Sequence, residues 1–228
     1  MQVLYEDNHI IIVNKIPGEI VQGDKTGDKP LVEIVREYLK EKYSKPGNVF
    51  CGVVHRLDRP VGGLVVFAKT SKALTRLNEM FREGRVHKTY WAISRNRPAQ
   101  PQGRLTHYIT TVEKNNKSTA HKSPVSNSKE ARLSYRLICE SDRYNLIEVK
   151  LETGRKHQIR VQLSAIGCPI RGDLKYGDKR SNPDGSISLM ARSIEFEHPV
   201  SHEIIKLTAP VPEGDALWAA MEKLSQED

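Results

Sequence analysis

The chain has 228 residues, which is enough for one large or two small domains with a buried core. Its 36 Lys and Arg residues exceed its 28 Asp and Glu, and the formal charge of +8 favours a polyanionic partner, although such a charge can also serve solubility alone. The 3 Cys residues are far apart without a C-x-x-C pair, which argues against a disulfide framework or a zinc site, and no apolar run suits a signal peptide or a membrane span. We therefore expect a cytoplasmic protein that uses no metal.

Hydrophobic patterning predicts both strands and helices along the chain. Residues 10–13 and 63–68 are continuous apolar runs typical of buried strands, whereas residues 31–39 repeat apolar side chains at helical spacing. Gly84 and Gly167 stand where two helices should end. In chain order we expect strands at 2–5 and 9–14, a helix at 31–39, a strand at 63–68, a helix that Ser71 caps and Gly84 ends, strands at 86–94, 105–112, 132–139 and 144–151, a helix at 156–166, strands at 187–196 and 203–208, and a helix at 215–224.

The order of these elements predicts the fold class. Strands outnumber helices and rarely alternate with them, so we expect an α+β fold with a largely antiparallel or mixed central sheet rather than a doubly wound parallel one. Residues 1–228 should form a single domain. Within it, the polar residues 95–130 should form loops or an insertion around one strand.

One short stretch brings charged residues next to a buried strand. It runs from His55 to Thr70 and reads HRLDRPVGGLVVFAKT, with Asp58 between Arg56 and Arg59. The two guanidinium groups should keep the Asp58 carboxylate ionised, which suits a nucleophile better than a proton donor. Taken alone, an Asp between two Arg residues is more often part of a surface ion pair. The assignment therefore depends on the rest of the sequence.

The same stretch resembles the signature of a known enzyme family. HRLD, then a turn of small residues and an apolar strand ending in Ala-Lys, is typical of the RNA pseudouridine synthases of the large-subunit rRNA and tRNA type, the RluA family. The resemblance continues in the expected order in NKIPG (14–18), HKTYWAI (87–93), LETGRKHQIRVQLSAIGCPIRGDLKYG (151–177) and LMARSIEFEHP (189–199). It covers nearly the full chain, and it implies a single catalytic domain with helices and loops around a catalytic cleft.

The resemblance implies an isomerase that converts uridine in tRNA or rRNA to pseudouridine by base flipping, with no organic cofactor. Asp58 matches the family's catalytic aspartate, Tyr90 its active-site tyrosine, and Arg160 the basic residue that pairs with the aspartate. Whether the carboxylate attacks the ribose or the base, or removes a ribose proton, stays open. From the residues alone, Tyr90 could be a core tyrosine of a strand and Arg160 a solvated helix residue.

A second set of residues is expected to contact RNA. A side chain next to the nucleophile could fill the space that a flipped uridine leaves, an aliphatic residue lines the family's pocket, and cations at strand ends or helix starts are well placed for phosphates. The residues in these positions are His55, Arg56, Leu189, Lys15, Arg155 and Lys156, and the polar segment adds Lys114, Lys117, Lys122 and Lys129.

The chain departs from the family pattern in three places. Val61-Gly62 replaces the usual Thr-Ser, and Gln162 stands where relatives often have His. These two changes concern substrate fit rather than reaction type. Because NKIPG begins at residue 14, we also expect a short form without the ribosomal-protein-like RNA-binding domain that many relatives carry, acting as a monomer.

Two alternatives to an isomerase remain. The first is an RNA-binding protein that kept the fold and lost turnover. The second is a carboxylate-dependent glycosidase, for which Glu152 and Asp173 are the nearest candidate acids. Nothing in the spacing of those two residues marks them as a catalytic pair.

Overall fold

The computed structural model describes residues 1–227, which form two compact units. The first unit comprises Met1–His87 and Ala191–Pro210, and the second comprises Lys88–Met190 and the residues from Val211 onward. Both contain antiparallel strands and helices, so the expected α+β class is confirmed. The expectation of one catalytic domain stays a prediction. Cys51, Cys139 and Cys168 are buried thiols.

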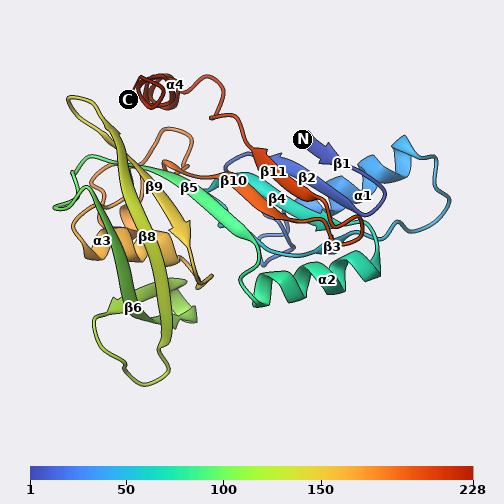
Figure 1. Ribbon diagram of the computed structural model, residues 1–228, viewed down its shortest axis with the longest axis horizontal. Helices are drawn as coiled ribbons and strands as arrows, with labels where there is room; N and C mark the ends of the chain where they lie inside the picture. The colour runs from blue at the N-terminus through green and yellow to red at the C-terminus, as the bar shows by residue number, and fades with distance from the viewer. Residues whose placement is uncertain (228) are drawn as a thin grey trace. The chain divides into compact units, whose positions relative to one another are not determined.

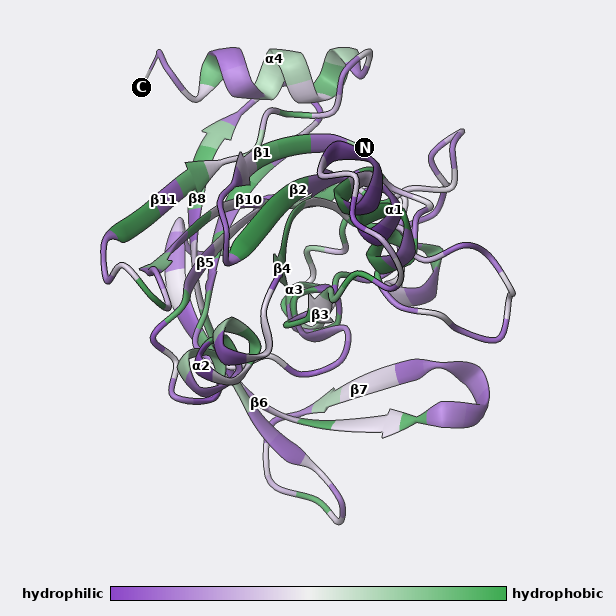
Figure 2. Ribbon diagram, turned by 90° about the vertical axis from the view of Figure 1, so that its right-hand side faces the viewer, coloured by the Kyte–Doolittle hydropathy of each residue, from purple (hydrophilic) through white to green (hydrophobic). Residues whose placement is uncertain are grey.

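The first unit is built on two strands with continuous apolar sequences. Ile10, Ile11, Ile12 and Val13 are fully buried, as Figure 2 shows by the hydrophobic colour along β2. All residues of β4 are buried as well. The elements are β1 (Gln2–Glu6), β2 (Ile10–Lys15), α1 (Leu31–Lys42), β3 (Gly52–Val53), β4 (Gly62–Ala68), α2 (Ser71–Arg82), β10 (Leu189–Glu197) and β11 (Ile204–Thr208), with strand order β1-β2-β4-β10-β11 and β3 on β4.

Side-chain hydrogen bonds to the backbone set where two of the helices begin. Thr70, not Ser71, caps α2, because its side-chain oxygen accepts a hydrogen bond from the backbone N–H of Ala73 at 3.2 Å. Ser71 is therefore the first helical residue. Asp215 caps α4 in the same way, with its carboxylate accepting from Leu217 and Trp218.

The second unit contains five antiparallel strands in the order β5-β9-β8-β6-β7. The predicted hairpin is confirmed, since β8 pairs with β9 along most of its length. The elements are β5 (His87–Ser94), β6 (Gln102–Val112), a 3-10 turn η1 (Glu113–Asn115), β7 (Lys117–His121), β8 (Lys129–Glu140), β9 (Asn145–Leu151), α3 (Gln158–Ala165), a 3-10 turn η2 (Leu174–Tyr176) and α4 (Ala216–Leu224). Figure 1 shows β6 and β8 as long neighbouring ribbons.

Half of residues 95–130 lie in strands, which is more strand than the single one expected in this polar segment. β6 begins three residues earlier than predicted, and β7 was not predicted at all. The reason is that only His107 and Ile109 of β6 and Ser118 of β7 are buried, so the hydrophobic alternation that identifies a strand is almost absent. Figure 2 shows β7 and its partner strand mostly in hydrophilic and neutral colours, with short hydrophobic stretches between them.

The helices of residues 1–227 are all too short or too polar to cross a membrane.

Candidate active site

Asp58 lies in the turn that connects β3 to β4, and we call residues 58–63 the Asp58 turn. The turn closes on itself through a hydrogen bond from the Val61 N–H to the Asp58 carbonyl at 3.0 Å. The Gly18 N–H donates to the Arg59 carbonyl at 2.8 Å and attaches the turn to the N-terminal loop. Asp58 itself is partly exposed. The main chain thus presents the carboxylate from a fixed position.

Lys15 supports the Asp58 turn from the inside. Its side chain is 1% exposed, and its ammonium donates to the carbonyls of Val61 at 2.7 Å and of Ile16 and Arg59 at 3.1 Å each. Burial lowers the pKa of Lys15 to about 8, while the carboxylates of Glu19 and Asp58 act in the opposite direction. With its ammonium occupied inside the protein, Lys15 does not fit the phosphate contact predicted for it.

Arg59 holds the outer side of the turn. Its guanidinium donates to Asp28 Oδ2 at 2.6 Å, to Thr26 Oγ1 at 2.7 Å and to Asp24 Oδ2 at 3.3 Å. Hydrogen bonding to Thr26 and Arg59 lowers the pKa of the Asp24 carboxyl. The Arg59 guanidinium therefore binds the loop of residues 24–28, in addition to being next to Asp58 in the sequence.

His55 and Arg56 differ in their surroundings. His55 Nε2 accepts a hydrogen bond from the Val66 N–H at 3.1 Å, and its ring stacks on Phe81 at 4.9 Å between ring centroids. His55 thus joins the approach to the turn to β4 and α2. Arg56 is exposed and can reach a ligand in solution. Of these two predicted RNA contacts, Arg56 fits the role better.

Two glycines complete the turn. Gly63 has φ of +108°, and a Cβ at this position would lie 2.3 Å from the backbone oxygen of Ala191. The close approach of two main chains therefore requires glycine at residue 63. Gly62 has more room, since a Cβ there would lie 3.2 Å from the Lys15 carbonyl oxygen. Of the two glycines, the one that departs from the family pattern, Gly62, is thus the one with more room for a side chain.

Arg160 lies on α3 in the second unit and is held by a buried carboxylate. Its Nε donates to Asp173 Oδ2 at 2.7 Å and its Nη2 to Asp173 Oδ1 at 2.9 Å, a bidentate pair. Asp173 is 1% exposed and Arg160 is 6% exposed. The guanidinium also lies over the Tyr176 ring, 5.0 Å from its centroid. Arg160 is therefore an oriented, buried cation and not a solvated helix residue.

Tyr176 connects this pair to the β6–β7 hairpin. Its hydroxyl accepts a hydrogen bond from the Ser118 N–H at 2.8 Å and lies 2.7 Å from His157 Nδ1. Ser118 Oγ in turn donates to the Lys156 carbonyl at 2.9 Å. We call Arg160, Asp173, Tyr176 and His157 the Arg160 cluster. Sequence reasoning missed Tyr176 and considered Asp173 only as a candidate glycosidase acid, although both stand in the GDLKYG segment that already carried the family resemblance.

Tyr90 and Leu189 are buried side chains of the second unit. Tyr90 is 7% exposed on β5, where it pairs with Val149 of β9, and Leu189 is 5% exposed at the start of β10. Tyr90, Arg160 and Leu189 belong to the second unit and Asp58 to the first. That the four side chains meet in one cleft stays a prediction.

Comparisons with known proteins show the family of this chain. The family model of RNA pseudouridylate synthase matches residues 9–165. Ribosomal large subunit pseudouridine synthase D of Zymomonas mobilis is 31% identical over 238 residues, covering 100% of this chain and 74% of that protein. The chain belongs to the RNA pseudouridylate synthase family. The predicted family and enzyme class, an isomerase, are thereby confirmed.

Further relatives define what the match covers. The tRNA pseudouridine synthase C of Pectobacterium carotovorum is 30% identical over 236 residues, which is 96% of this chain but 60% of that protein. The human RNA Pseudouridylate Synthase Domain Containing 4 structure covers 99% of this chain and 93% of its own at a TM-score of 0.79 and 23% identity, which shows the same fold. The chain thus spans between 60% and 74% of the length of its curated relatives.

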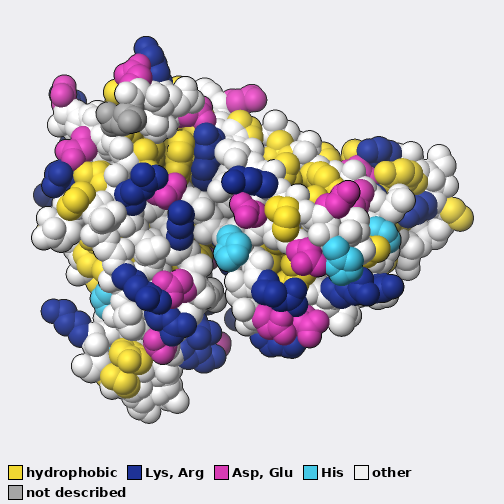
Figure 3. All heavy atoms as spheres, viewed as in Figure 1, with side chains coloured by type: hydrophobic (Ala, Val, Ile, Leu, Met, Phe, Trp, Pro, Cys, Tyr) yellow, Lys and Arg dark blue, Asp and Glu magenta, His cyan; other side chains and the backbone are white. Residues whose placement is uncertain are grey.

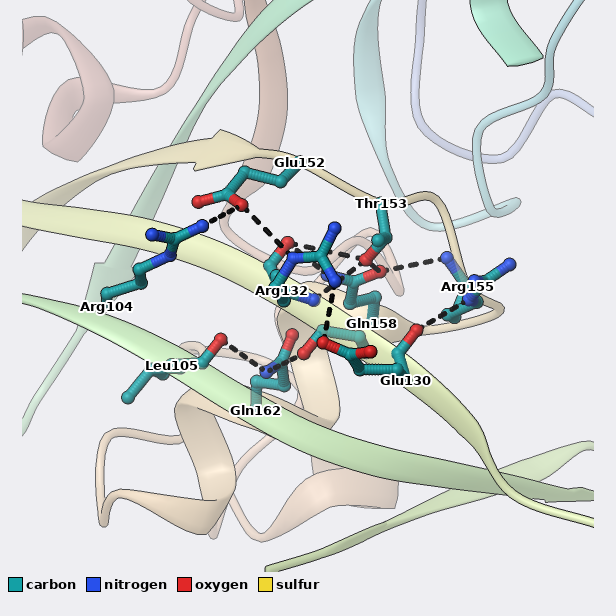
Figure 4. A network of polar contacts seen from close by, with 10 residues as sticks. Arg104, Leu105, Glu130, Arg132, Glu152, Thr153, Arg155, Gln158 and Gln162 are labelled. Atoms are coloured by element: carbon teal, nitrogen blue, oxygen red, sulfur yellow. Dashed lines mark hydrogen bonds and ion pairs between the residues drawn. The ribbon is translucent and has the colours of Figure 1, made fainter. Parts of the chain in front are cut away.

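In this member of the pseudouridylate synthase family, a network of charges joins β6 and β8 to the segment that follows β9 (Figure 4). Arg104 donates to Glu152 at 2.5 Å, and Arg132 donates to both Glu152 and Glu130. Arg155 is exposed and donates through Nε to the Glu130 carbonyl at 2.9 Å. Figure 3 likewise shows basic side chains beside acidic ones on the face drawn. Arg155 therefore joins a mixed-charge surface.

The exposed cations of this family member include other predicted RNA contacts. Lys156 is exposed two residues before α3, Lys114 is exposed in η1, and Lys117 and Lys129 are exposed as the first residues of β7 and β8. Gln162 is different, because it is fully buried and its Nε2 lies 3.0 Å from His107 Nδ1 and 3.2 Å from the Ala131 carbonyl. This departure from the family pattern thus concerns packing inside the second unit.

The two acids considered for a glycosidase are both bound to arginine. Asp173 forms the fork with Arg160, and Glu152 accepts from Arg104 and Arg132. Hydrogen bonding to Arg104 lowers the pKa of Glu152. A glycosidase needs one acid with a raised pKa, so the structure gives no support to that alternative. Among residues 1–227, no group of three or more His, Cys, Asp or Glu side chains is placed to hold a metal ion.

Proposed function

We propose that this chain isomerises uridine to pseudouridine in tRNA or rRNA, with Asp58 as the nucleophile. The observation that carries the proposal is the construction of the Asp58 turn, in which Lys15 donates to three turn and loop carbonyls and Asp58 is partly exposed. Catalytic groups must be held close to their productive geometry by surrounding bonds. A surface ion pair would not need such support.

The reaction breaks two bonds and forms two. The bond from ribose C1′ to uracil N1 breaks, the base rotates, and a bond forms from C1′ to C5, after which C5 loses its proton and N1 carries one. Asp58 assists the first step as an ionised carboxylate, either on the sugar or on the base. The Tyr90 ring stacks on the uracil base, and its hydroxyl assists proton transfer at C5. Arg160 pairs with the Asp58 carboxylate, with its own orientation set by Asp173.

The proposed substrate is a uridine that leaves its stack and enters the cleft, since its reacting atoms are inaccessible in a stacked helix. The relatives named above act, by their names, on large-subunit rRNA and on tRNA. The charge of +8 supports an RNA partner, with Arg56 next to the flipped nucleotide and Lys156 on phosphate. Binding should weaken steeply with added salt. We also propose that the protein acts in the cytoplasm, as a monomer.

Release of tritium from RNA labelled at uridine C5 tests the proposal directly. Wild type should release label from bulk tRNA or rRNA, whereas Asp58→Asn should lose about a thousandfold or more of the rate, because the residual effects of binding and positioning alone are small. Asp142→Asn, which changes an exposed turn acid, is the matched control and should keep full activity. RNA binding of Asp58→Asn should stay close to wild type.

The same experiment decides the second candidate, an RNA-binding protein without turnover. If wild type binds RNA but releases no more label than Asp58→Asn, the isomerase proposal fails. Mapping pseudouridines in total RNA from a strain without the gene then identifies the modified uridine, or shows that none is lost.

A further inference from the structure

The first unit contains a surface hollow that the proposed reaction does not use. It has a volume of about 560 Å³ and lies between α1 and residues 47–51. Its lining includes Arg36 and Lys40 from the helix and Asn48 and Phe50 from the segment that follows. We call it the Phe50 hollow. Its residues combine an aromatic ring, an amide and two cations.

Phe50 is unusual among the phenylalanines of the chain. Its side chain is 45% exposed, whereas Phe67 is fully buried and Phe196 is 2% exposed. The backbone next to it is fixed, because Cys51 is 4% exposed, its carbonyl accepts from Arg36 Nη2 at 3.4 Å, and β3 begins at the next residue. An exposed aromatic ring on an anchored backbone leaves apolar area in water that a ligand can cover.

The charges at the hollow favour an anion. Arg36 and Lys40 are four residues apart on α1 and therefore lie on one face of the helix, and both are exposed. The carboxylate of Glu37, which also lines the hollow, is bound by Lys29 at 2.5 Å. The remaining charge is positive, and Arg and Lys are the usual contacts of phosphate oxygens.

The hollow is far from the Asp58 turn within the same unit. Gly52 of β3 pairs with Ala68 at one end of β4, whereas Gly62 and Gly63 of the turn form the other end. The seven residues of β4 span about 20 Å. A group bound at Phe50 is thus not the reacting uridine.

We propose that the Phe50 hollow binds a single-stranded nucleotide of the RNA that flanks the isomerised uridine, with its base stacked on Phe50 and its phosphate on Arg36 and Lys40. Stacking on an aromatic ring beside cations is the common way in which proteins bind unpaired nucleotides without reading sequence. The inference rests on the proposed function for its choice of RNA as the ligand. It adds a binding site outside the catalytic centre.

A fluorescence-anisotropy titration with a labelled single-stranded oligouridylate tests the site. Phe50→Ala should weaken binding about tenfold, the usual loss for one stacked base. Lys40→Ala should weaken it less and reduce its dependence on salt. The matched controls are Ile204→Ala and Lys206→Ala, which remove an exposed apolar side chain and an exposed lysine elsewhere in the same unit.

A second variant gives a readout that loss of folding cannot imitate. Phe50→Trp should keep the wild-type affinity, and its added fluorescence should be quenched when oligouridylate binds, since the larger ring stacks equally well. Equal affinity of wild type and Phe50→Ala, or no change in Trp fluorescence, would overturn the proposal. So would a concentration-dependent dimer that Phe50→Ala abolishes, because the hollow would then receive a second copy of the chain.

The outcome can be separated from the proposed isomerase activity. Phe50→Ala should retain the wild-type turnover at saturating RNA and raise only the RNA concentration needed. Asp58→Asn should show the opposite pattern, with normal oligouridylate binding and no turnover. If wild type proves inactive, oligouridylate binding at Phe50 is still measured, so one proposal can fail without the other.

Discussion

The Asp58 turn and the Arg160 cluster hold their functional side chains in different ways. Around Asp58, the bonds are made by main-chain groups, with the buried Lys15 ammonium on the carbonyls of Arg59 and Val61. Around Arg160, the bonds are made by side chains, through the fork to Asp173 and the Tyr176 ring. The stability of the Asp58 turn, which is held by main-chain groups, should therefore be sensitive to side-chain volume added at its glycines. The Arg160 cluster, which is held by side chains, should be sensitive to the loss of a charge.

The largest expected effect is from Gly63→Ala in the Asp58 turn. The new Cβ would lie 2.3 Å from the Ala191 backbone oxygen, and φ of +108° is unfavourable for any other residue. We expect a loss of about 3 kcal/mol or more in the free energy of unfolding, measured by urea denaturation. Gly18→Ala is the control, because φ is +93° there but no atom lies within 4 Å of the added Cβ. Equal losses in both variants would show that crowding at Ala191 is unimportant.

An effect of similar size is expected from Asp173→Asn in the Arg160 cluster. Removing one partner of a buried ion pair leaves the other charge uncompensated and typically costs about 3–5 kcal/mol. Tritium release should fall through kcat, with RNA affinity unchanged, because Arg160 loses its orientation. Asp28→Asn is the matched control, since it removes a partner of the exposed Arg59 and should change little. If Asp173→Asn and Asp28→Asn lose the same stability and activity, the burial of Arg160 does not make its ion pair more important than that of Arg59.

This contrast also explains what the sequence could predict. Strands with continuous apolar runs, such as residues 10–13 and 63–68, were placed within a residue or two, because burial on both faces requires that composition. β7 was missed because its one buried residue is the polar Ser118, so its sequence lacks the apolar alternation of a core strand. Pattern therefore identifies the strands that form the core and not those that extend from it.

The candidate site shows the same limit. Asp58, Tyr90 and Arg160 were proposed from motifs. A motif identifies residues by their local sequence but does not show which side chains or carbonyls they contact. Lys15 was expected on the surface at a strand end, whereas it is 1% exposed and bound to carbonyls up to 46 residues away. The Asp173 fork joins residues 13 positions apart across a turn. Such contacts depend on tertiary packing, which no local pattern specifies.

A smaller effect is expected from Lys15→Met, which removes the cation inside the Asp58 turn. The carbonyls of Ile16, Arg59 and Val61 lose their donor, so we expect a loss of about 1–3 kcal/mol in unfolding free energy and a lower kcat. Lys25→Met, at an exposed lysine of the same unit, should have neither effect.

The pH dependence of this variant follows from the lowered pKa of Lys15. The folded protein releases the Lys15 proton at about pH 8, whereas the unfolded chain keeps it to the usual lysine pKa of 10.5. Between these values the unfolded state binds more protons, so this group makes wild type more stable as pH rises. The difference between wild type and Lys15→Met in urea should therefore widen from pH 8 to pH 10.5. A constant difference would mean that the ammonium is not buried in solution.

The smallest effect is expected from Gly62→Ser, which restores the residue that relatives usually have. A Cβ at residue 62 would lie 3.2 Å from the Lys15 carbonyl oxygen and 3.3 Å from the Pro17 side chain, so these neighbours need to move by only a few tenths of an ångström. We expect a change in unfolding free energy of less than about 1 kcal/mol and unchanged tritium release. A loss of unfolding free energy as large as that of Gly63→Ala would mean that residue 62 has no room for a side chain either. Val61-Gly62 would then be required by the structure of the Asp58 turn and would not be a difference in substrate fit.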